Sequence, residues 1–314
     1  MKEDSQLKQL NSVWKSLRTR GLLRTIILGI DEFPCLSAVL TRFAGEETFM
    51  KFRYYALFGY FRNIENPRSF NEKIQYRKFH GYDSRYSMIS DKHAVRDLVS
   101  EQIGDHILTN LYHVTGDPNT IPFDSLPDHF VVKPNHMSGE ILFVDSDDAM
   151  DVDDIKKVCR NWLDTTYGQH KGEYWYAEIP PKILIEEDLR YELNYPPRDY
   201  KFYVFDGEVM YVHVDLNRLT SHTRRFYDPD WVPQNFTFNY PLGDISEEPD
   251  NLETMIQIAE TLGSDYDFIR VDLYELPDGS IIFGELTVAP GSGASPFTPH
   301  DVDFHFGNLW NQQV

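Results

Sequence analysis

The second half of the chain alternates apolar and polar residues in a way that predicts two β-hairpins. Residues 200–205 and 208–214 are rich in aromatic and β-branched side chains, and residues 268–276 and 280–287 repeat the pattern. Each pair flanks an Asp-Gly dipeptide, which favours a tight two-residue turn. We therefore expect hairpins to dominate this half of the protein.

Elsewhere, helical periods of apolar residues are interspersed with short apolar runs. The expected helices cover residues 71–80, 91–103, 155–166 and 252–262. Ser90 or Asp91 is expected to cap the second of them. The expected strands cover residues 130–133, 141–144 and 182–186. This mixture is typical of an α+β protein built in lobes.

An acidic run, residues 145–154, precedes the third expected helix. It superficially resembles a calcium-binding loop, but such a loop needs a carboxylate and then a glycine where this chain has Ala149 and Met150. We therefore interpret the run as a turn followed by a negatively charged helix N-terminus.

The first segment, residues 5–24, places leucines and Trp14 at helical spacing and gathers basic residues on the opposite face. A basic face fits peripheral contact with a membrane surface or a partner, and it also fits the solvated face of a packed helix, which we favour. The apolar stretch 21–40 contains Arg24, Asp31 and Glu32, so it does not predict a membrane span.

Composition limits the possible partners. The 314 residues are enough for two or three packed lobes, and their formal net charge is −20. An acidic surface repels phosphate backbones, so we expect no nucleic-acid partner, and any smaller anion needs a local cluster of Lys and Arg. Cys35 and Cys159 form no metal motif or disulfide framework. The absence of a secretory signal makes the cytoplasm the expected compartment.

The last hairpin contains the strongest candidate chemistry. With a two-residue turn at Asp278-Gly279, Asp272 lies opposite Glu285. The same register sets Arg270 opposite Thr287, and the period of two places all four side chains on one face. Facing carboxylates repel, and Mg²⁺ bridged to nucleotide phosphates would relieve the repulsion. In that case, replacing either carboxylate by its amide should do little harm to folding.

Two alternatives remain open for this hairpin. The carboxylates could be solvent-facing partners of Arg270, and a three-residue turn would shift the pairing by one position. The Gly-rich segment 290–293 follows directly, and its backbone N–H groups could hold an anionic substrate or a developing oxyanion. An ordinary turn is the other interpretation of that segment.

Three motifs of this region resemble the metal end of ATP-grasp enzymes: Arg270-Val-Asp-Leu-Tyr-Glu275, Phe283-Gly-Glu-Leu-Thr287 and Pro290-Gly-Ser-Gly293. They look most like the TupA-like branch, which is found with bacterial capsule and teichuronopeptide synthesis. The resemblance covers about residues 66 to 300. Its other pieces are Asn66-Pro-Arg-Ser-Phe-Asn-Glu-Lys-Ile-Gln75, Asp91-Lys-His-Ala-Val-Arg96, Phe130-Val-Val-Lys-Pro-Asn-His136 with Ser138-Gly139, Lys182-Ile-Leu-Ile-Glu-Glu187, Asp199-Tyr-Lys-Phe202 and Tyr227-Asp-Pro-Asp-Trp231.

The resemblance implies an ATP-grasp fold, in which two α+β lobes clasp ATP, preceded by a helical N-terminal region. The expected boundaries are residues 1–90 for that region, 91–187 for the first lobe and 188–314 for the second lobe with the metal site.

The resemblance also implies roles for individual residues. The ATP phosphates would be neutralised by Lys92, Lys133 and Lys201. They would be covered by the loop containing His136, Ser138 and Gly139, in which Met137 stands where the family usually has Gly. The nucleoside would be bound by Glu186, by the backbone of Glu187 and Leu189 at the base, and by Asp199 at the ribose.

At the reacting end, the resemblance implies that Asp272 and Glu285 hold Mg²⁺. Thr287 stands where many ATP-grasp enzymes have Asn, so it would act mainly through a water. Arg270 would stabilise an acyl phosphate and a tetrahedral intermediate. Ser292 and Gly293 complete the expected catalytic set.

The implied activity is that of an ATP-dependent ligase, which activates a carboxylate as an acyl phosphate and joins it to an amine. An amino acid and a sugar acid of a surface polysaccharide are candidate substrates. A kinase on the same fold would use the same residues and remains open. A glycosyltransferase and a non-catalytic nucleotide-binding protein are further alternatives.

Overall fold

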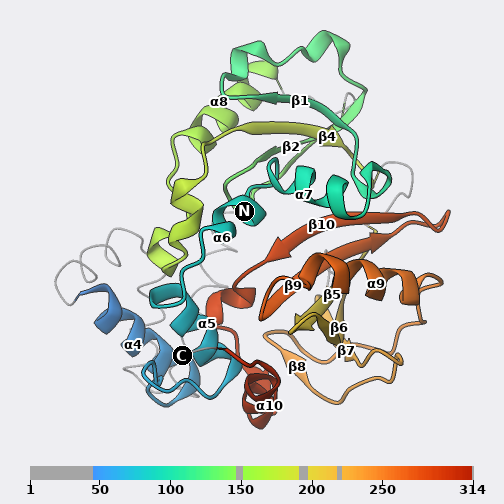
Figure 1. Cartoon of the computed structure of the whole chain (residues 1–314). Helices are drawn as coiled ribbons and strands as arrows, with labels where there is room; N and C mark the ends of the chain where they lie inside the picture. The colour runs from blue at the N-terminus through green and yellow to red at the C-terminus, as the bar shows by residue number, and fades with distance from the viewer. Residues whose placement is uncertain (1–44, 146–150, 191–196, 218–220, 313–314) are drawn as a thin grey trace.

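The structure, a computed structural model, describes residues 45–145, 151–190, 197–217 and 221–312 (Figure 1). The predicted helix at 5–24 and the centre of the acidic run lie outside these residues. The α-helices are α4 (Glu46–Phe58), α5 (Phe70–Phe79), α6 (Arg85–Ser90), α7 (Val95–Gln102), α8 (Val152–Leu163), α9 (Leu252–Gly263) and α10 (Asp301–Leu309). Among the described helices, none has both the length and the apolar composition needed to cross a bilayer.

The first sheet contains four antiparallel strands in the order β1-β4-β2-β3. These strands are β1 (Leu111–Thr115), β2 (His129–Pro134), β3 (Leu142–Asp145) and β4 (Ile183–Glu187). α8 contributes Ile155, Cys159 and Trp162 to the core under this sheet. Its acidic N-terminus acts as predicted, because the Asp151 carboxylate caps the helix by accepting from the backbone N–H of Asp153.

The second sheet contains five antiparallel strands in the order β10-β9-β5-β6-β7. They are β5 (Arg198–Phe205), β6 (Glu208–Leu216), β7 (Thr223–Tyr227), β9 (Phe268–Glu275) and β10 (Ile281–Thr287). A separate two-stranded ribbon pairs β8 (Thr237–Phe238) with β11 (Phe297–Thr298). α9 packs so closely on this sheet that a Cβ at Gly263 would lie 2.6 Å from a Val204 methyl group. Figure 1 shows the first sheet above the second, with α7 between them and the β10 edge of the second sheet facing the first.

Aromatic rings join α5 and the C-terminal helix α10 to the second sheet. The Phe70 ring on α5 lies 4.9 Å from Phe268 on β9 and 5.8 Å from Phe306 on α10, measured between centroids. The Trp310 ring centroid also lies 5.8 Å from that of Phe70. α5 therefore packs into the core of the second sheet, although its sequence position is far from it.

The α+β mixture and both hairpins are confirmed, but several elements differ from expectation. The helix expected at 91–103 is present as α7 but begins only at Val95, and a separate helix, α6, ends at Ser90. The expected cap at Ser90 or Asp91 is wrong, because Ala94 precedes α7 and no side chain caps it. The Asp91 carboxylate accepts from the backbone N–H of His93 and from the Asn135 amide, which fixes a turn between the two helices. The sequence patterns did not predict the helices α4, α6 and α10 or the strands β1, β7, β8 and β11.

Candidate functional site

The turn of the β9–β10 hairpin differs from the predicted one, yet the pairing beyond it is as predicted. Three residues form the turn, because Leu276 pairs with Ser280 and the third loop residue, Gly279, has φ 84°. A bulge at Gly284 then shifts the register back, since Phe283 faces Leu273 whereas Glu285 faces Asp272. The two offsets cancel, so the predicted opposition of Asp272 and Glu285 is confirmed.

Arg270 connects all the polar side chains of this face. Its guanidinium donates to Asp272 Oδ1 at 2.6 Å, to Glu285 Oε1 at 3.0 Å and to Thr287 Oγ1 at 2.9 Å. Asp272 is buried, whereas the Glu285 side chain is 40% exposed. The interpretation of both carboxylates as solvent-facing is therefore wrong for Asp272 and holds only for Glu285.

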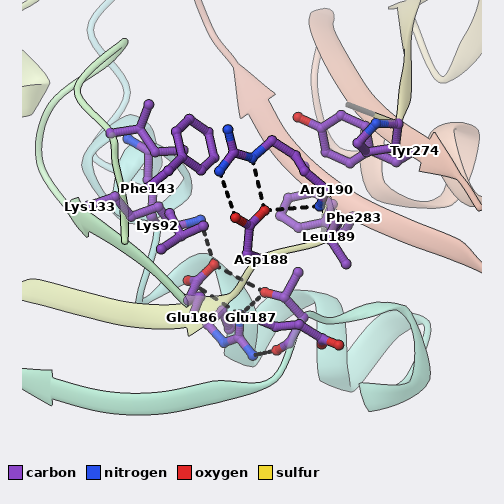
Figure 2. Close-up of a pocket in the computed structure, with 16 residues that line it drawn as sticks. Lys92, Lys133, Phe143, Glu186, Glu187, Asp188, Leu189, Arg190, Tyr274 and Phe283 are labelled. Carbon is purple, nitrogen blue, oxygen red and sulfur yellow. Dashed lines mark hydrogen bonds and ion pairs between the residues drawn. The ribbon is translucent and has the colours of Figure 1, made fainter. Parts of the chain in front are cut away.

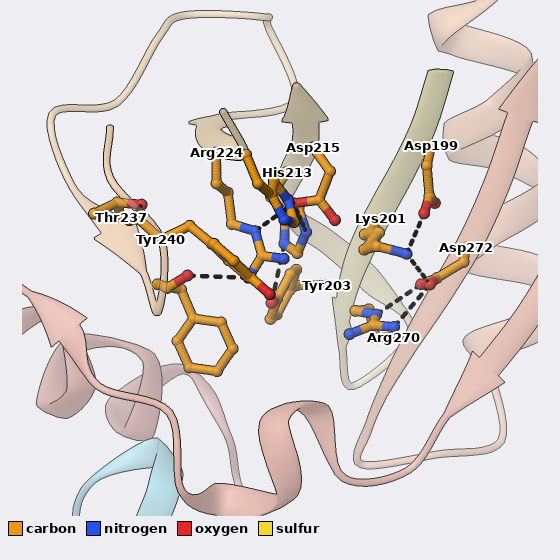
Figure 3. A network of polar contacts seen from close by, with 12 residues as sticks. Asp199, Lys201, Tyr203, His213, Asp215, Arg224, Thr237, Tyr240, Arg270 and Asp272 are labelled. Carbon is orange, nitrogen blue, oxygen red and sulfur yellow. Dashed lines mark hydrogen bonds and ion pairs between the residues drawn. The ribbon is translucent and has the colours of Figure 1, made fainter. Parts of the chain in front are cut away.

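Lys201 is the second cation on Asp272. It lies on the neighbouring strand β5 and pairs with Asp272 and, at 2.7 Å, with Asp199 (Figure 3). Burial raises the pKa of Asp272, but the charges of Arg270 and Lys201 more than offset this and lower it to about 2. Asp272 is thus an anion held between two buried cations.

The donor set fits Mg²⁺ only if the metal brings further ligands. The described residues contain no cluster of three His, Cys, Asp or Glu side chains that could hold a metal by itself. Two facing carboxylates and a threonine hydroxyl match a Mg²⁺ ion that keeps waters and nucleotide phosphates in its shell. Asp272, Glu285 and Thr287 would hold such an ion, with Arg270 beside it.

The polar face continues across the sheet in a network that the sequence analysis missed (Figure 3). Lys201 lies opposite His213 on β6, and the Asp215 carboxylate two residues on accepts from Arg224 at 2.7 Å. Asp215 also lies 3.0 Å from His222. Burial and the charge of Arg224 lower the pKa of His213, which keeps its imidazole neutral at neutral pH. Only the antiparallel registers of β5, β6 and β7 bring these residues together.

A cavity of about 410 Å³ lies beside this face, between the two sheets (Figure 2). Its walls include five residues predicted from the sequence: Lys92, Lys133, Glu186, Glu187 and Leu189. They also include residues that were not predicted, among them Phe143, Arg190, Tyr274 and Phe283. The Arg190 guanidinium stacks 3.2 Å from the Phe143 ring centroid and pairs with Asp188 at 2.7 Å. Apolar walls with a few charged groups are typical of a nucleotide-sized site.

Lys133 and Glu186 meet at the inner wall of the cavity. Lys133 Nζ lies 2.6 Å from Glu186 Oε2, and the Thr109 hydroxyl donates to the same oxygen at 3.1 Å. Glu186 is buried and also lies 3.8 Å from Arg96. Lys133 therefore already has a protein partner, because β2 and β4 are neighbours in the first sheet.

Lys92 lies in the turn between α6 and α7 and reaches into the same cavity. Its ammonium donates to the backbone carbonyl of Met137. Burial lowers the pKa of Lys92 to about 8, against the opposing influence of nearby Glu285. A lysine of the α6–α7 turn and a carboxylate of the second sheet therefore influence each other electrostatically.

The predicted phosphate loop has two parts. His136 and Met137 are buried, and the His136 ring contacts the Thr165 carbonyl at 3.2 Å. Met137 packs in the core of the first sheet and is not among the residues with positive φ, so position 137 does not need a glycine for a left-handed backbone. Ser138 and Gly139 are exposed at the tip.

The Gly-rich turn after β10 is η6 (Pro290–Gly293). Gly291, Ser292 and Gly293 have φ of 58°, 56° and 60° in succession. The backbone N–H of Ser292 donates a hydrogen bond to the carbonyl oxygen of Ala289, and the backbone N–H of Ala294 donates to the carbonyl oxygen of Gly291. These two N–H groups are therefore already engaged within the turn.

Comparison with known proteins identifies the family of the chain. A model of the TupA-like ATP-grasp family matches residues 72–311, so the chain belongs to that family and has the ATP-grasp fold. No curated protein matches the chain.

Solved structures with a similar chain trace include three ATP-grasp ligases. A D-alanine–D-alanine ligase from Bacillus anthracis has a TM-score of 0.43 at 17% identity, over 71% of this chain and 65% of that chain. The VanG D-Ala:D-Ser ligase from Enterococcus faecalis has a TM-score of 0.40 at 13% identity, over 71% of this chain and 60% of that chain. The ATP-grasp ligase PsnB, complexed with a minimal precursor, has a TM-score of 0.38 at 14% identity, over 65% of this chain and 54% of that chain. This chain therefore spans less than two thirds of each of these proteins.

Proposed function

We propose that this member of the TupA-like ATP-grasp family is an ATP-dependent carboxylate–amine ligase. In the proposed reaction the substrate carboxylate attacks the γ-phosphate of ATP and releases ADP. The acyl phosphate is then attacked by an amine, which displaces phosphate and leaves an amide. The reaction uses ATP and Mg²⁺ and takes place in the cytoplasm, where ATP is available.

One observation carries the proposal. The cavity lined by Lys92, Lys133 and Glu186 also has Gly284 in its wall, and Gly284 directly precedes Glu285 in the cluster of Arg270, Asp272 and Glu285. The charge of Glu285 also acts on Lys92. A nucleotide whose base lies in the cavity would extend its phosphates toward these cations and carboxylates. Phosphoryl transfer needs mainly positioning and charge neutralisation, and this arrangement supplies both.

The residues have distinct tasks in this proposal. Glu186 accepts the adenine amino group, and the backbone of Glu187 and Leu189 lines the base. Asp199 binds the ribose, or, through its pair with Lys201, fixes that lysine at the terminal phosphates. Bound Mg²⁺ would supply positive charge at the transferring phosphoryl group.

The remaining groups stabilise the acyl transfer. Arg270 is rigidly held by Asp272 and Thr287, so its guanidinium is preorganised beside the developing oxyanion. The ATP phosphates are neutralised by Lys92 and Lys133 and covered by the loop of His136, Ser138 and Gly139. Ser292 and Gly293 lie in the turn that follows the metal-binding strand.

The TupA-like family setting suggests the substrate class. We propose an amino acid and a sugar acid of a surface polysaccharide as the amine and carboxylate. The domains are proposed as the N-terminal region 1–90, a first lobe 91–187 and a second lobe 188–314.

A kinase on the same fold is the main competing function, because it would use the same lysines and carboxylates. The test incubates the full chain with Mg²⁺, ATP and pools of amino acids and sugar acids, and follows ADP release and product masses. A ligase needs two substrates and yields an amide, whereas a kinase needs one and yields a stable phosphorylated product. Absence of any ADP formation would favour a non-catalytic nucleotide-binding protein.

A further inference from the structure

α5 holds the backbone of the Gly-rich turn from outside both sheets. The Gln75 amide donates to the carbonyl oxygens of Ser292 and Gly293, each at 2.9 Å. The Lys78 ammonium donates to the Ser292 carbonyl and to its hydroxyl, again at 2.9 Å. Two side chains one helical turn apart thus make four hydrogen bonds to two consecutive residues of the turn.

The turn needs such support because its backbone is unusual. Ser292 is not a glycine, yet it has φ 56° between two glycines that are also left-handed. A left-handed non-glycine residue costs about 1–3 kcal/mol and persists only where its surroundings impose it. Without Gln75 and Lys78, the carbonyls they cap would lose these hydrogen bonds at a buried contact with the helix.

The contact is also close in space. A Cβ at Gly293 would lie 2.8 Å from a methyl carbon of Ile74 and 3.0 Å from the Asn71 carbonyl oxygen. Glycine is therefore required for the turn to sit directly on the helix. The Asn71 side chain continues the contact by donating to the Ser295 carbonyl at 3.0 Å.

The Gln75 amide is itself oriented by a residue that precedes the helix. The Arg62 guanidinium donates to Gln75 Oε1 at 2.8 Å, so the amide nitrogen is directed at the turn. Arg62, Gln75 and Lys78 are all buried. Side chains of the N-terminal region therefore form a connected path to the turn that follows Thr287.

We propose that Gln75 and Lys78, with Arg62 behind Gln75, are positioning residues that keep the Gly-rich turn in its left-handed form for the acyl-transfer step. The helical N-terminal region is then a working part of the active site and not only a stabilising addition. The kinetic part of this inference rests on the proposed ligase function, whereas its structural part does not.

The test uses the full chain with Gln75→Met, Lys78→Met and the rescue variant Lys78→Arg. Lys73→Met is the matched control, because Lys73 lies on the same helix but donates to the Trp310 carbonyl, away from the turn. The first readout is amide hydrogen exchange of a peptide covering residues 289–295. Each Met variant loses two hydrogen bonds to the turn. A net loss of about 1.4 kcal/mol corresponds to about tenfold faster exchange, which we expect in both Met variants but not in the control.

The second readout separates positioning from general stability. Mg²⁺–ATP affinity and melting temperature should stay near wild type, while kcat for amide formation falls by about 100-fold, the size of effect expected from a misplaced reacting group. Lys78→Arg should recover most of kcat. Unchanged exchange in both Met variants would overturn the inference, as would faster exchange with unchanged kcat.

Two further outcomes are also decisive. If Gln75→Met and Lys78→Met fail to fold while Lys73→Met folds, the contacts are structural and the positioning role is wrong. If wild type consumes ATP with no substrate pair, the proposed ligase function fails, but the exchange data still decide whether α5 holds the turn.

Discussion

Asp272 lies directly opposite Glu285 across β9 and β10, and Arg270 contacts both carboxylates. The two acids nevertheless occupy different environments. Asp272 is buried between Arg270 and Lys201, whereas the Glu285 side chain is 40% exposed. Their amide variants should therefore affect activity in the same way and stability in different ways.

Asp272→Asn should abolish Mg²⁺-dependent ADP release and also destabilise the fold. Removing the carboxylate leaves two buried cations without their shared partner, and breaking a buried ion pair costs about 3–5 kcal/mol. This revises the sequence-based expectation that the amide does little harm. Denaturant unfolding, run beside an ADP-release assay, measures both effects.

Glu285→Gln is the matched comparison. It should lose Mg²⁺-dependent turnover as well, but its unfolding free energy should change by less than about 1 kcal/mol because its ion pair is partly solvated. Wild-type turnover in both variants would remove the metal-binding role. Equal destabilisation of the two would contradict the difference in burial.

Lys133→Ala should weaken Mg²⁺–ATP binding by roughly 10- to 100-fold, since a hydrogen bond to a charged group contributes about 1.5–3 kcal/mol. Its pair with Glu186 complicates a single substitution, because Glu186 also loses a partner. Calorimetric titration of Lys133→Ala, Glu186→Gln and the double variant separates the two effects. Lys182→Ala, at a lysine that does not line the cavity, serves as the control. Unchanged affinity in Lys133→Ala would remove it from the site.

Lys92 should make ATP binding dependent on pH. Its pKa in the free protein is lowered to about 8 by burial, and phosphate oxygens would favour the ammonium form and raise the pKa. Binding should therefore take up a proton above that value, and affinity should fall as pH rises through it. Calorimetry roughly one pH unit above that value, in two buffers of different ionisation enthalpy, measures the uptake. Persistence of the uptake in Lys92→Met would assign it to another group.

Gly307→Ala tests the packing of α10 on the chain before α5. A Cβ at Gly307 would overlap the carbonyl oxygen of Arg68, which is backbone and cannot rotate away. We expect a loss of roughly 1–3 kcal/mol in unfolding free energy, as for other overpacked contacts. Gly116→Ala is the control, because a Cβ added at Gly116 would have no neighbouring atom within 4 Å. Equal melting temperatures for the two variants would contradict this packing.

Local patterns predicted the parts of the site that one hairpin contains. The period of two and an Asp-Gly pair were enough to bring Arg270, Asp272, Glu285 and Thr287 to one face. These patterns could not reveal the three-residue turn or the bulge at Gly284. The turn shifts the strand register by one residue and the bulge shifts it back, so the pairing of Asp272 with Glu285 is the same without either. The predicted pairing was thus correct although the predicted turn was wrong.

Contacts between distant segments left no local signal. The network of His213, Asp215 and Arg224 depends on the registers of three strands. The contact of Gln75 with Ser292 joins residues that are 217 positions apart. The pair of Lys133 with Glu186 could not be predicted, because Glu186 lies on a strand that becomes its neighbour only in the folded sheet.

The most direct test of the proposed ligase follows the carboxylate oxygen. The substrate acid found in the pools is labelled with oxygen-18 and incubated with the protein, Mg²⁺, ATP and the amine. We predict that one labelled oxygen appears in inorganic phosphate for each amide and each ADP formed, and that turnover requires both substrates. A phosphorylated acid that accumulates without any need for the amine, and with no label in inorganic phosphate, would contradict it.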